Sequence, residues 1–439
     1  MKIFLYLFFG SFLVQSFAQS FERCSFVLMD SVANGNHIEK DKQFENWIKS
    51  KQNQKKNVRT EADTARFKIP VIVHVVHNGE LMDIGANISY EQVKSQILVL
   101  NEDFNRIYST PGYNTDINGA NINVEFVLAT HDPTGNLLAE PGVDRYDGNR
   151  AAWNIFLVNL DLKPKTIWNP DDYFNIWTIN LDGFKSRFLL GYAQFPDQSS
   201  LPGLNTSGGS AATDGVVVDY QFFGSRDKGD FPSLAQGNYG KGRTCTHEVG
   251  HWLGLRHIWG DGPCEVDDYC DDTPASDSAN YGCQIGRIRC GGVQMIENYM
   301  DYSDDACMNI FTKNQKERID IVLQNSPRRK SLAQNTNYVR LYPQVVEPPT
   351  IAKSTPNTSS QSPFQIYPNP SNSHFFANWE KSATYEWKLI DIYTGLIIKT
   401  GSGNDRQTTI FFDENNHLGL FLFEIKIDTV VYHTKIIRN

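Results

Sequence analysis

The chain has 439 residues, of which 40% are hydrophobic and 21% are charged, as in ordinary globular proteins and unlike disordered or fibrous chains. Its length predicts two or three folded units together with processing segments. The formal net charge is -9, and no run of clustered Lys and Arg stands out. This balance argues against a nucleic-acid partner, because phosphate binding requires such clusters.

The N-terminal residues have the pattern of a secretory signal peptide, which we assign to residues 1–18. Lys2 precedes an apolar stretch from Ile3 to Val14, and Ser16 and Ala18 form a small-x-small cleavage site. The apolar stretch is shorter than the roughly 20 residues that span a bilayer. We therefore expect a secreted protein, extracellular or at the cell surface, with no membrane span; a membrane anchor is the alternative.

Residues 19–65 are polar, rich in lysine and without a sustained strand pattern, which favours a removable pro-segment over a core element. The basic tract from Lys51 to Arg59 offers bonds that a protease can cut. This segment contains Cys24, whereas the other six cysteines lie between Cys245 and Cys307. Six cysteines in an exported protein predict disulfides, but their spacing allows about 15 connectivities.

A first folded domain is predicted for residues 66–340. The β-branched run from Phe67 to His77 predicts a buried strand, and a helix follows from an N-cap at Ser89, with Val93, Ile97, Leu100 and Phe104 on one apolar face. A second helix is predicted from Arg243 to Leu253. Further strands are expected at Asn123–Thr130, Phe174–Leu181, Tyr192–Phe195 and Gly215–Asp219. The layout is α/β (α+β) with a mixed twisted sheet.

The C-terminal part of the chain predicts a separate all-β unit. Residues 341–363 are rich in Pro, Ser and Thr and lack an apolar period, which is typical of an extended linker. Residues 364–439 then offer short alternating runs such as WKLIDIY, TTIFF and LFLFEIKI, broken by Gly, Asn and Asp. This pattern predicts a small β-sandwich.

The segment HEVGHWLGLRH, from His247 to His257, carries the chemistry. On a helix, His247 and His251 project from the same face one turn apart and can bind a single ion. Gly254 can end the helix and bring His257 to a third position. Three neutral histidine ligands leave one position of a zinc ion open for water.

Glu248 directly follows the first histidine. Its carboxylate can accept the proton of the attacking water and pass it to the leaving amine of a peptide. A short HExxH pattern alone arises by chance in helices, but the added glycine and third histidine make a coincidence improbable. His74 and His77 lie in the predicted strand and are expected to have no role in the metal site.

Downstream, ENYMDYSDDAC places Met300 in a predicted tight turn, and the long histidine motif followed by a methionine turn marks the metzincins. Together with GRTCTHEVGHWLGLRHIWGD, DDTP, NYGC and NYMDYSDDACMNIFTKNQKERI, the region from about Phe67 to Leu332 resembles the pappalysin family of metzincin zinc proteases. Bacterial members of the ulilysin and cytophagalysin type are included in this resemblance.

The resemblance implies a two-lobed catalytic domain with an active-site helix. Met300 would form an apolar floor under the metal, and Tyr302 would stand beside the zinc, where it can donate a hydrogen bond to the oxyanion; a packed turn residue is the alternative for Tyr302. The strand Gly191–Pro196 is similar to the family's cleft-edge strand, which binds extended substrates by main-chain hydrogen bonds.

The same resemblance implies roles for the cysteines. It suggests the disulfides Cys264–Cys290 and Cys283–Cys307. Cys245 and Cys270 depart from the smallest version of that pattern, and we pair them with each other. Cys24, in ERCSF, is similar to the cysteine that keeps pappalysin zymogens latent by ligating the zinc; an unpaired thiol without a function is the alternative. The acidic loops DDYCDDTP and MDYSDD are candidates for Ca2+, as in some family members, or are ordinary solvated loops.

The C-terminal motifs QIYPNPSN, DIYTG, HLGLFLFEIKI and KIIRN resemble the sorting domain of the type IX secretion route of Bacteroidetes. Secretion machinery is therefore an expected partner, and a carbohydrate-binding or adhesive sandwich is the competing interpretation. For the whole chain we expect a secreted zinc metalloendopeptidase acting on proteins and peptides. A surface adhesion or binding protein with a structural zinc is the main alternative, and zinc-dependent hydrolysis of a non-peptide bond is a third.

Overall fold

The computed structural model describes residues 21–24, 37–55, 66–182, 188–196, 209–335, 364–367, 374–379, 384–391, 397–412, 419–427 and 430–438. The chain divides into two compact units, Met1–Tyr338 and Val339–Asn439. The predicted signal peptide at 1–18 and linker at 341–363 lie outside the described residues. In the part of the chain that the structure describes, no helix is both long and apolar enough to cross a membrane.

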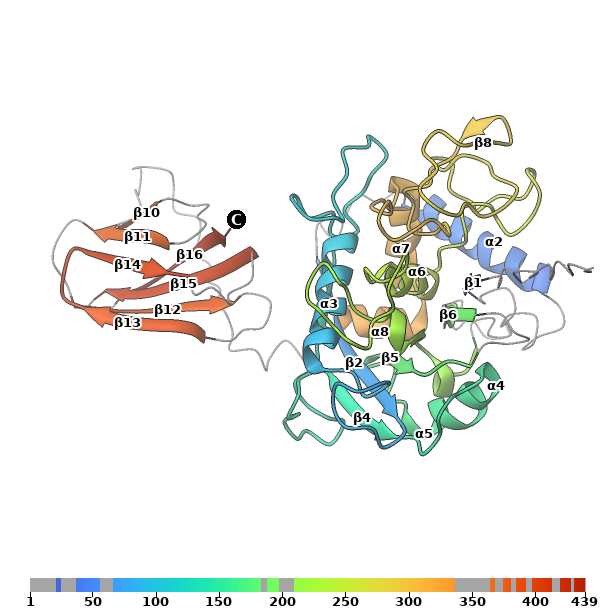
Figure 1. The fold of residues 1–439 in the computed structure, drawn as a ribbon. Coiled ribbons are helices and arrows are strands. Elements are labelled where there is room, and N and C mark those ends of the chain that lie inside the picture. Colours follow the sequence, from blue (N-terminus) through green and yellow to red (C-terminus); the bar gives the residue numbers. More distant parts are fainter. Residues whose placement is uncertain are drawn as a thin grey trace, which may run out of the picture. The chain divides into compact units, whose positions relative to one another are not determined.

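The first unit is built on a seven-stranded mixed sheet in the order β1-β6-β7-β5-β2-β3, with β4 also paired to β2 (Figure 1). Strand β6 runs antiparallel to β7, and all other pairs are parallel. The strands are β1 (Phe21–Cys24), β2 (Phe67–His77), β3 (Val124–Leu128), β4 (Val143–Asp147), β5 (Phe174–Ile179), β6 (Phe188–Ala193) and β7 (Val216–Asp219).

Strand β2 lies inside the sheet, and both of its faces are covered by other parts of the chain. This burial explains why its sequence is almost continuously apolar. Ile69, Val71, Val73 and Val75 belong to the main core, while Val76 belongs to a second cluster on the opposite face. Figure 1 shows α3 and α6 on one side of the strands and the segment containing α4 and α5 on the other.

The helices begin at recognisable capping residues. Ser89 caps α3 (Tyr90–Phe104), as the sequence predicts, and Thr312 forms a capping box with Gln315 at the start of α7 (Lys313–Asn325). The remaining helices of this unit are α4 (Ile155–Leu157), the π-helix η2 (Val158–Leu162), α5 (Lys163–Thr166), the short 3-10 turns η4 (Ala211–Thr213) and η5 (Tyr220–Phe222), α6 (Arg243–Trp252) and α8 (Pro327–Gln334).

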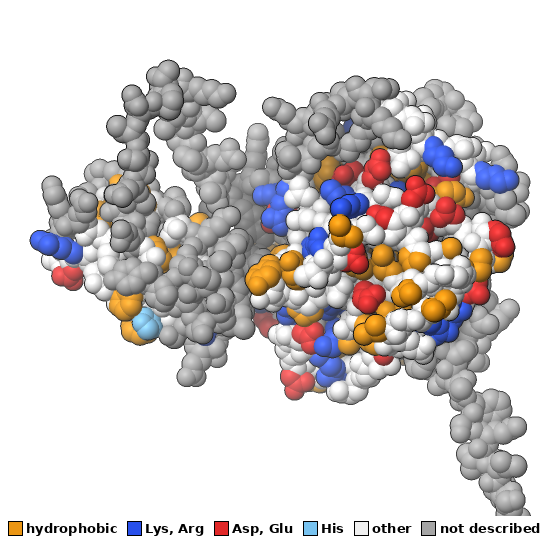
Figure 2. Space-filling model, turned by 90° about the horizontal axis from the view of Figure 1, so that it is seen from above, with side chains coloured by type: hydrophobic (Ala, Val, Ile, Leu, Met, Phe, Trp, Pro, Cys, Tyr) orange, Lys and Arg blue, Asp and Glu red, His pale blue; other side chains and the backbone are white. Residues whose placement is uncertain are grey.

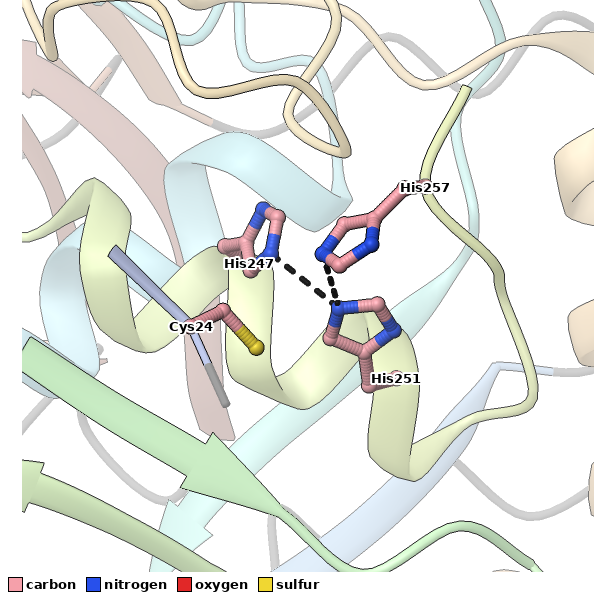
Figure 3. A group of neighbouring side chains, drawn as sticks. All are labelled: Cys24, His247, His251 and His257. Carbon is pink, nitrogen blue, oxygen red and sulfur yellow. Dashed lines mark hydrogen bonds between the residues drawn. The ribbon is translucent and has the colours of Figure 1, made fainter. Parts of the chain in front are cut away.

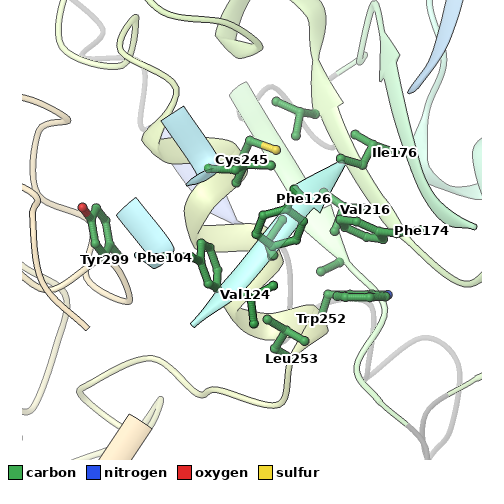
Figure 4. Close-up of a cluster of buried hydrophobic side chains, with 14 of the residues drawn as sticks. Phe104, Val124, Phe126, Phe174, Ile176, Val216, Cys245, Trp252, Leu253 and Tyr299 are labelled. Carbon is green, nitrogen blue, oxygen red and sulfur yellow. The ribbon is translucent and has the colours of Figure 1, made fainter. Parts of the chain in front are cut away.

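The main core fixes α6 against the sheet. Figure 4 shows aromatic side chains from α3, β3 and β5 next to those of α6. Trp252, at the end of α6, stacks on Phe174 of β5 with ring centroids 3.9 Å apart, and Phe104 packs edge-on against Phe126 at 5.1 Å. The helix that carries two of the predicted metal ligands is therefore held by large buried contacts.

The two described parts of the N-terminal segment form elements that the sequence analysis did not predict. Strand β1 adds to the edge of the sheet, parallel to β6, and α2 (His37–Lys55) packs on α7. Sequence analysis missed the helix because its apolar residues Phe44, Trp47 and Ile48 are buried by a surface that comes from distant parts of the chain.

The second unit is a β-sandwich, as the sequence predicts. One antiparallel sheet has the order β10-β11-β14 and the other β13-β12-β15-β16, and one core contains side chains from both sheets. The strands are β10 (Phe364–Tyr367), β11 (His374–Trp379), β12 (Tyr385–Asp391), β13 (Ile397–Gly403), β14 (Gln407–Phe411), β15 (Gly419–Ile427) and β16 (Val430–Arg438).

Most predicted elements of the first unit are found within one or two residues of their expected ends. The cleft-edge strand is an exception: β6 occupies Phe188–Ala193, whereas the sequence favoured Gly191–Pro196 and Tyr192–Phe195. The difference arises because pairing with β1 and β7 sets the ends of β6.

On the face seen in Figure 2, described acidic and basic side chains are interspersed with hydrophobic ones.

Candidate metal centre

Helix α6 and the turn after it bring the three predicted histidines together. His247 and His251 lie one turn apart on α6, and all ten residues of this helix are buried. Gly254 has φ +90°, in the left-handed region, and turns the chain so that His257 returns to the same point. Figure 3 shows the three rings turned toward one another, with the sulfur of Cys24 pointing into the same space.

The ring nitrogens have the spacing that a metal ion requires. The Nε2 atom of His251 lies 3.1 Å from Nε2 of His247 and 3.1 Å from Nε2 of His257. Tetrahedral zinc with nitrogen ligands at about 2.1 Å requires nitrogens roughly 3.4 Å apart. A group of ligand atoms from Cys24 and the three histidines lies within 4.8 Å of one another.

The opposite ring nitrogens determine which tautomer is present. Nδ1 of His247 donates to the Tyr299 carbonyl at 2.7 Å, and Nδ1 of His251 donates to the Leu255 carbonyl at 2.9 Å. Both acceptors are carbonyl oxygens, so each Nδ1 must carry the proton and each Nε2 presents a lone pair. Burial, followed by the charge of His257, lowers the pKa of His251 well below its ordinary value, which favours the neutral ligand form.

His257 is oriented by a carboxylate. Its Nδ1 lies 2.6 Å from Asp261 Oδ1, and its ring stacks on Trp259 with centroids 4.2 Å apart. A carboxylate behind a metal-binding histidine fixes the ring and increases its basicity. Neither Trp259 nor Asp261 was predicted to have a role, although both lie in the segment HIWGD; their spacing of two and four residues from the third histidine was the available signal.

Cys24 and Glu248 meet at the open side of the histidines. The Cys24 thiol donates to Glu248 Oε2 at 3.3 Å, and Cys24 is 3% exposed. Pairing of Cys24 with Gly191 in the β1–β6 register places the thiol there. Gly191 leaves room for the carboxylate, because a Cβ at this position would lie 3.1 Å from Glu248 Cγ.

Met300 lies below α6 in a tight turn. Asp301 N donates to the Asn298 carbonyl at 3.1 Å, and Asn298 Oδ1 accepts from Met300 N at 2.9 Å, so the turn is closed by main-chain and side-chain bonds. The Met300 sulfur packs directly on Gly250, where a Cβ would overlap it. The methionine thus supports the helix between its two histidines.

Tyr302 borders the histidine cluster. Its ring centroid lies 5.6 Å from that of His247 and 5.1 Å from that of His257, and its hydroxyl donates to the Cys24 carbonyl at 3.1 Å. Burial raises the pKa of Tyr302 well above its ordinary value, with smaller contributions from Cys24 and nearby carboxylates, so the phenol keeps its proton.

Two buried carboxylates hold the start of α6. Asp103 of α3 accepts from Thr246 Oγ1 at 2.7 Å and from Arg243 Nη2 at 3.1 Å. Asp305, which follows the methionine turn, accepts from the main-chain N–H groups of Lys241 at 2.9 Å and Arg243 at 3.2 Å. Negative charge at a helix N-terminus is favourable, and these bonds couple α6 to α3 and to the methionine turn.

The disulfide predictions are partly confirmed. Cys264 pairs with Cys290 and Cys283 pairs with Cys307, as expected. The predicted Cys245–Cys270 bond is wrong, because both cysteines are free and buried. Cys245 lies on α6 in the main core, where Figure 4 shows it, whereas Cys270 belongs to the acidic loop. Burial raises the pKa of both thiols, which makes them poor nucleophiles.

Other predicted features lie away from the histidine cluster. His74 bonds to Asp144 at 2.8 Å and to Asn175 at 2.9 Å, on the opposite face of the sheet from α6. In the described acidic loop, Asp268 accepts from Thr273 and Cys270 N, and Asp272 accepts from Asn314 N. These carboxylates do not form a set of three converging ligand atoms among the described residues, so calcium stays a prediction.

Comparison with known proteins agrees with this site. The family model described as Pregnancy-associated plasma protein-A, peptidase family M43, matches residues 231–324. An extracellular metalloprotease of Verticillium alfalfae is 42% identical over 259 residues, which is 58% of this chain and 75% of that protein. An extracellular metalloprotease 1 of Coccidioides posadasii is 32% identical over 58% of this chain and 76% of that protein.

Solved structures give the same result. Mature mirolysin of Tannerella forsythia with a cleaved peptide has 37% sequence identity and a TM-score of 0.51, covering 62% of this chain and 97% of that chain. A promirolysin mutant of the same organism has 35% identity and a TM-score of 0.56, covering 71% of this chain and 97% of that chain. A metalloprotease of this family requires a metal, and the histidine cluster is suited to hold it. The chain therefore belongs to the pappalysin family (M43) of metalloproteases.

Proposed function

We propose that this chain is a secreted zinc endopeptidase, made as a latent precursor, with His247, His251 and His257 as the metal ligands and Glu248 as the general base. One observation carries the proposal: three buried Nε2 atoms converge while the Nδ1 atom of each ring is held by an oxygen acceptor. This arrangement presents three neutral lone pairs to one ion, which is the donor set of catalytic zinc sites.

When bound, zinc supplies a Lewis acid that polarises a peptide carbonyl and increases the acidity of a water molecule. Glu248 accepts a proton from the attacking water and passes it to the leaving amine. The Tyr302 phenol donates a hydrogen bond to the oxygen on which negative charge develops. Met300 supports the helix and keeps both of its histidines at a fixed separation.

Strand β6 is our candidate for binding the substrate main chain. In the structure β1 occupies the edge of β6, with Cys24 opposite Gly191. Once β1 leaves, the same edge offers N–H and C=O groups to an extended peptide directly above Glu248. Main-chain binding of this kind tolerates many side chains, which suits a protease that acts on proteins.

Cys24 is proposed to keep the precursor inactive. Its sulfur lies where the attacking water is needed, because it is close to the three ring nitrogens and bonds to Glu248 at 3.3 Å. A thiolate is a good zinc ligand and would exclude that water. The promirolysin structure matches a larger share of this chain than mature mirolysin does, 71% against 62%, which supports a pro-segment at 19–65.

We also propose secretion through the signal peptide at 1–18 and the sandwich at 364–439 as a type IX sorting domain. The extracellular relatives support export, and the two-sheet core of the second unit supports a folded C-terminal module. A truncation after residue 340 is then expected to retain proteolytic activity in vitro but not to reach the medium when expressed in a host with that secretion route.

The central experiment compares the processed wild-type protein with a Glu248→Ala variant in cleavage of casein, with zinc content measured in both. We expect the wild type to cleave, a chelator to abolish cleavage, and the variant to bind zinc without cleaving. If both proteins are inactive with zinc bound and the pro-segment removed, the chain is instead an adhesion or binding protein with a structural zinc.

A further inference from the structure

A buried anion site lies outside the histidine cluster, at the contact between α2 and the rest of the first unit. Glu45 of α2 accepts from Arg318 Nη1 at 2.6 Å and from Arg318 Nη2 at 3.0 Å, and Arg256 Nε donates to Glu45 Oε1 at 2.9 Å. The side chains of Glu45, Arg318 and Arg256 are only 4%, 1% and 9% exposed. Two-pronged guanidinium binding of a carboxylate is geometrically specific.

The site is built by the enzyme and only filled by α2. Arg318 also donates to the Gly254 carbonyl at 3.1 Å, which holds its guanidinium in place independently of Glu45. Tyr269 provides an aromatic wall, since Arg256 and Arg318 lie 5.7 Å and 5.8 Å from its ring centroid. These groups come from three separate loops and helices, and none of them belongs to the N-terminal segment.

Apolar contacts surround the ion pair. Phe44, Trp47 and Ile48 of α2 form one buried cluster with Ile321 and Val322 of α7. Phe44 also meets Phe195 edge-on with centroids 4.8 Å apart. The pattern that is bound is therefore a short stretch of helix. It consists of the carboxylate of Glu45, the aromatic Phe44 directly before it, and the apolar Trp47 and Ile48 two and three residues after it.

Loss of Glu45 without replacement is unfavourable, because it would leave two guanidinium groups close together with their shared counter-ion removed. Burial raises the pKa of Glu45 and the two arginines lower it more strongly, so the carboxylate is ionised at neutral pH. The arginines that bind Glu45 lie outside the predicted pro-segment, so they remain on the chain when that segment is cut off.

We propose that Arg256, Arg318 and Tyr269, with the apolar surface of α7, form a peptide-binding site that recognises residues 37–55 of this chain in trans after the pro-segment is cut off. This inference rests on the proposed pro-segment and goes beyond it, because the binding involves neither Cys24 nor the metal. Since Cys24 and α2 are on the same segment, docking of α2 also raises the effective concentration of the thiol at the histidines.

The test uses a fluorescent synthetic peptide of residues 37–59 and the processed full-length protein carrying Glu248→Ala, cut at the basic tract 51–59 with trypsin and freed of the N-terminal fragment. Binding is measured by fluorescence anisotropy with and without a zinc chelator. We expect saturable binding that the chelator does not change. The Glu45→Gln peptide is expected to bind at least about 30-fold more weakly, as for other buried charge pairs.

Two controls separate the site from general effects. An Asn46→Ala peptide changes an exposed residue next to Glu45 on the same helix and is expected to bind as the wild-type peptide does. An Arg318→Met protein is expected to lose binding, and its folding is checked by zinc content. The peptide variants cannot disturb folding of the protein. Equal binding of the Glu45→Gln and wild-type peptides, or no binding of either, therefore overturns this proposal without deciding the separate casein-cleavage test of the proposed function.

Discussion

Gly191 on β6 lies against Glu248 on α6, so closely that a Cβ on residue 191 would stand 3.1 Å from Glu248 Cγ and 2.8 Å from the Val217 carbonyl oxygen. The glycine therefore sets the separation between the proposed substrate-binding strand and the proposed base. Both neighbours are constrained, because Val217 is part of β7 and Glu248 is on a fully buried helix.

Replacing Gly191 with Ala should displace either β6 or the Glu248 carboxylate. We expect kcat/KM of the processed protein to fall about 100-fold, the effect typical of misplacing a catalytic group by about 1 Å. Zinc content should be unchanged. Gly292→Ala is the matched control, since its Cβ would find no atom closer than 3.8 Å; equal activity of Gly191→Ala and wild type would contradict the assigned role of β6.

Asp261 should control metal affinity through His257. Asp261→Ala removes the acceptor 2.6 Å from His257 Nδ1, and we expect zinc binding to weaken about 10- to 100-fold. Asp261→Asn keeps an acceptor oxygen and tolerates the positive φ of 60° at this position, so it should retain more affinity than Asp261→Ala. Competition with a chelator measures both. Identical affinities for wild type and Asp261→Ala would show that this bond does not tune the site.

Tyr302→Phe tests oxyanion stabilisation. If the phenol donates to the developing oxyanion, the processed variant should lose about 100-fold in kcat, as when other single oxyanion donors are removed. KM and zinc content should change little, because the ring that contacts His247 and His257 is retained. A variant with wild-type kcat would identify Tyr302 as a packed turn residue.

Cys24→Ala should activate the unprocessed precursor. Removing the thiol opens the position beside Glu248 and the histidines, so we expect casein cleavage by full-length chains before the pro-segment is lost, with the intact mass verified at each time point. Cys270→Ala removes a different buried thiol and serves as control; it should stay latent. Continued latency of Cys24→Ala with zinc bound would mean that β1, paired with the edge of β6, blocks substrate binding without the thiol.

Lys163 predicts a dependence of stability on pH. Its ammonium group is buried, donates to the Thr213 carbonyl at 3.1 Å and lies 4.7 Å from the Tyr192 ring and 5.0 Å from the Trp177 ring. Burial lowers the pKa of Lys163 from 10.5 to about 7, against the opposing charge of Asp214. The folded chain thus binds fewer protons than the unfolded chain between these pH values, and its stability rises as the pH rises from 7 to 10.5.

Lys163→Met should abolish this contribution. Both proteins carry Glu248→Ala, which prevents self-digestion. The free energy of unfolding of Lys163→Met, minus that of the protein that keeps Lys163, should be higher at pH 7 than at pH 10 by an amount on the order of 3 kcal/mol. Urea unfolding at the two pH values measures it. Lys165→Met, at an exposed lysine, should show no such change. A pH-independent difference for Lys163→Met would contradict the argument.

The elements that the sequence predicts best are those whose pattern is local. The alternating runs of the C-terminal unit are strands, Ser89 caps α3, and His247 and His251 share a helix face because a four-residue spacing has only one geometric consequence on a helix. The left-handed glycine after α6 was also predictable, since few other residues adopt that conformation.

Features that depend on contacts between distant segments escaped prediction. Helix α2 has too few apolar residues to be recognised without the surface of α7 that covers them. Cys245 and Cys270, which depart from the smallest version of the family's cysteine pattern, were expected to pair with each other, yet the core position of α6 keeps Cys245 away from the acidic loop. A disulfide requires Cα atoms within about 7 Å of each other, and spacing along the chain does not determine that.

The sequence by itself predicted the proposed centre: the order of histidines, glutamate and glycine places three imidazoles and a carboxylate on one helix and its turn, because helical geometry follows from local spacing. Only the tertiary structure decided how that centre is oriented and closed. The Tyr299 and Leu255 carbonyls and the Asp261 carboxylate select the tautomers, and β1 brings Cys24 to Glu248 across a sheet edge. Hydrogen-bond partners and sheet neighbours are set by how the whole chain packs, so no local pattern encodes them.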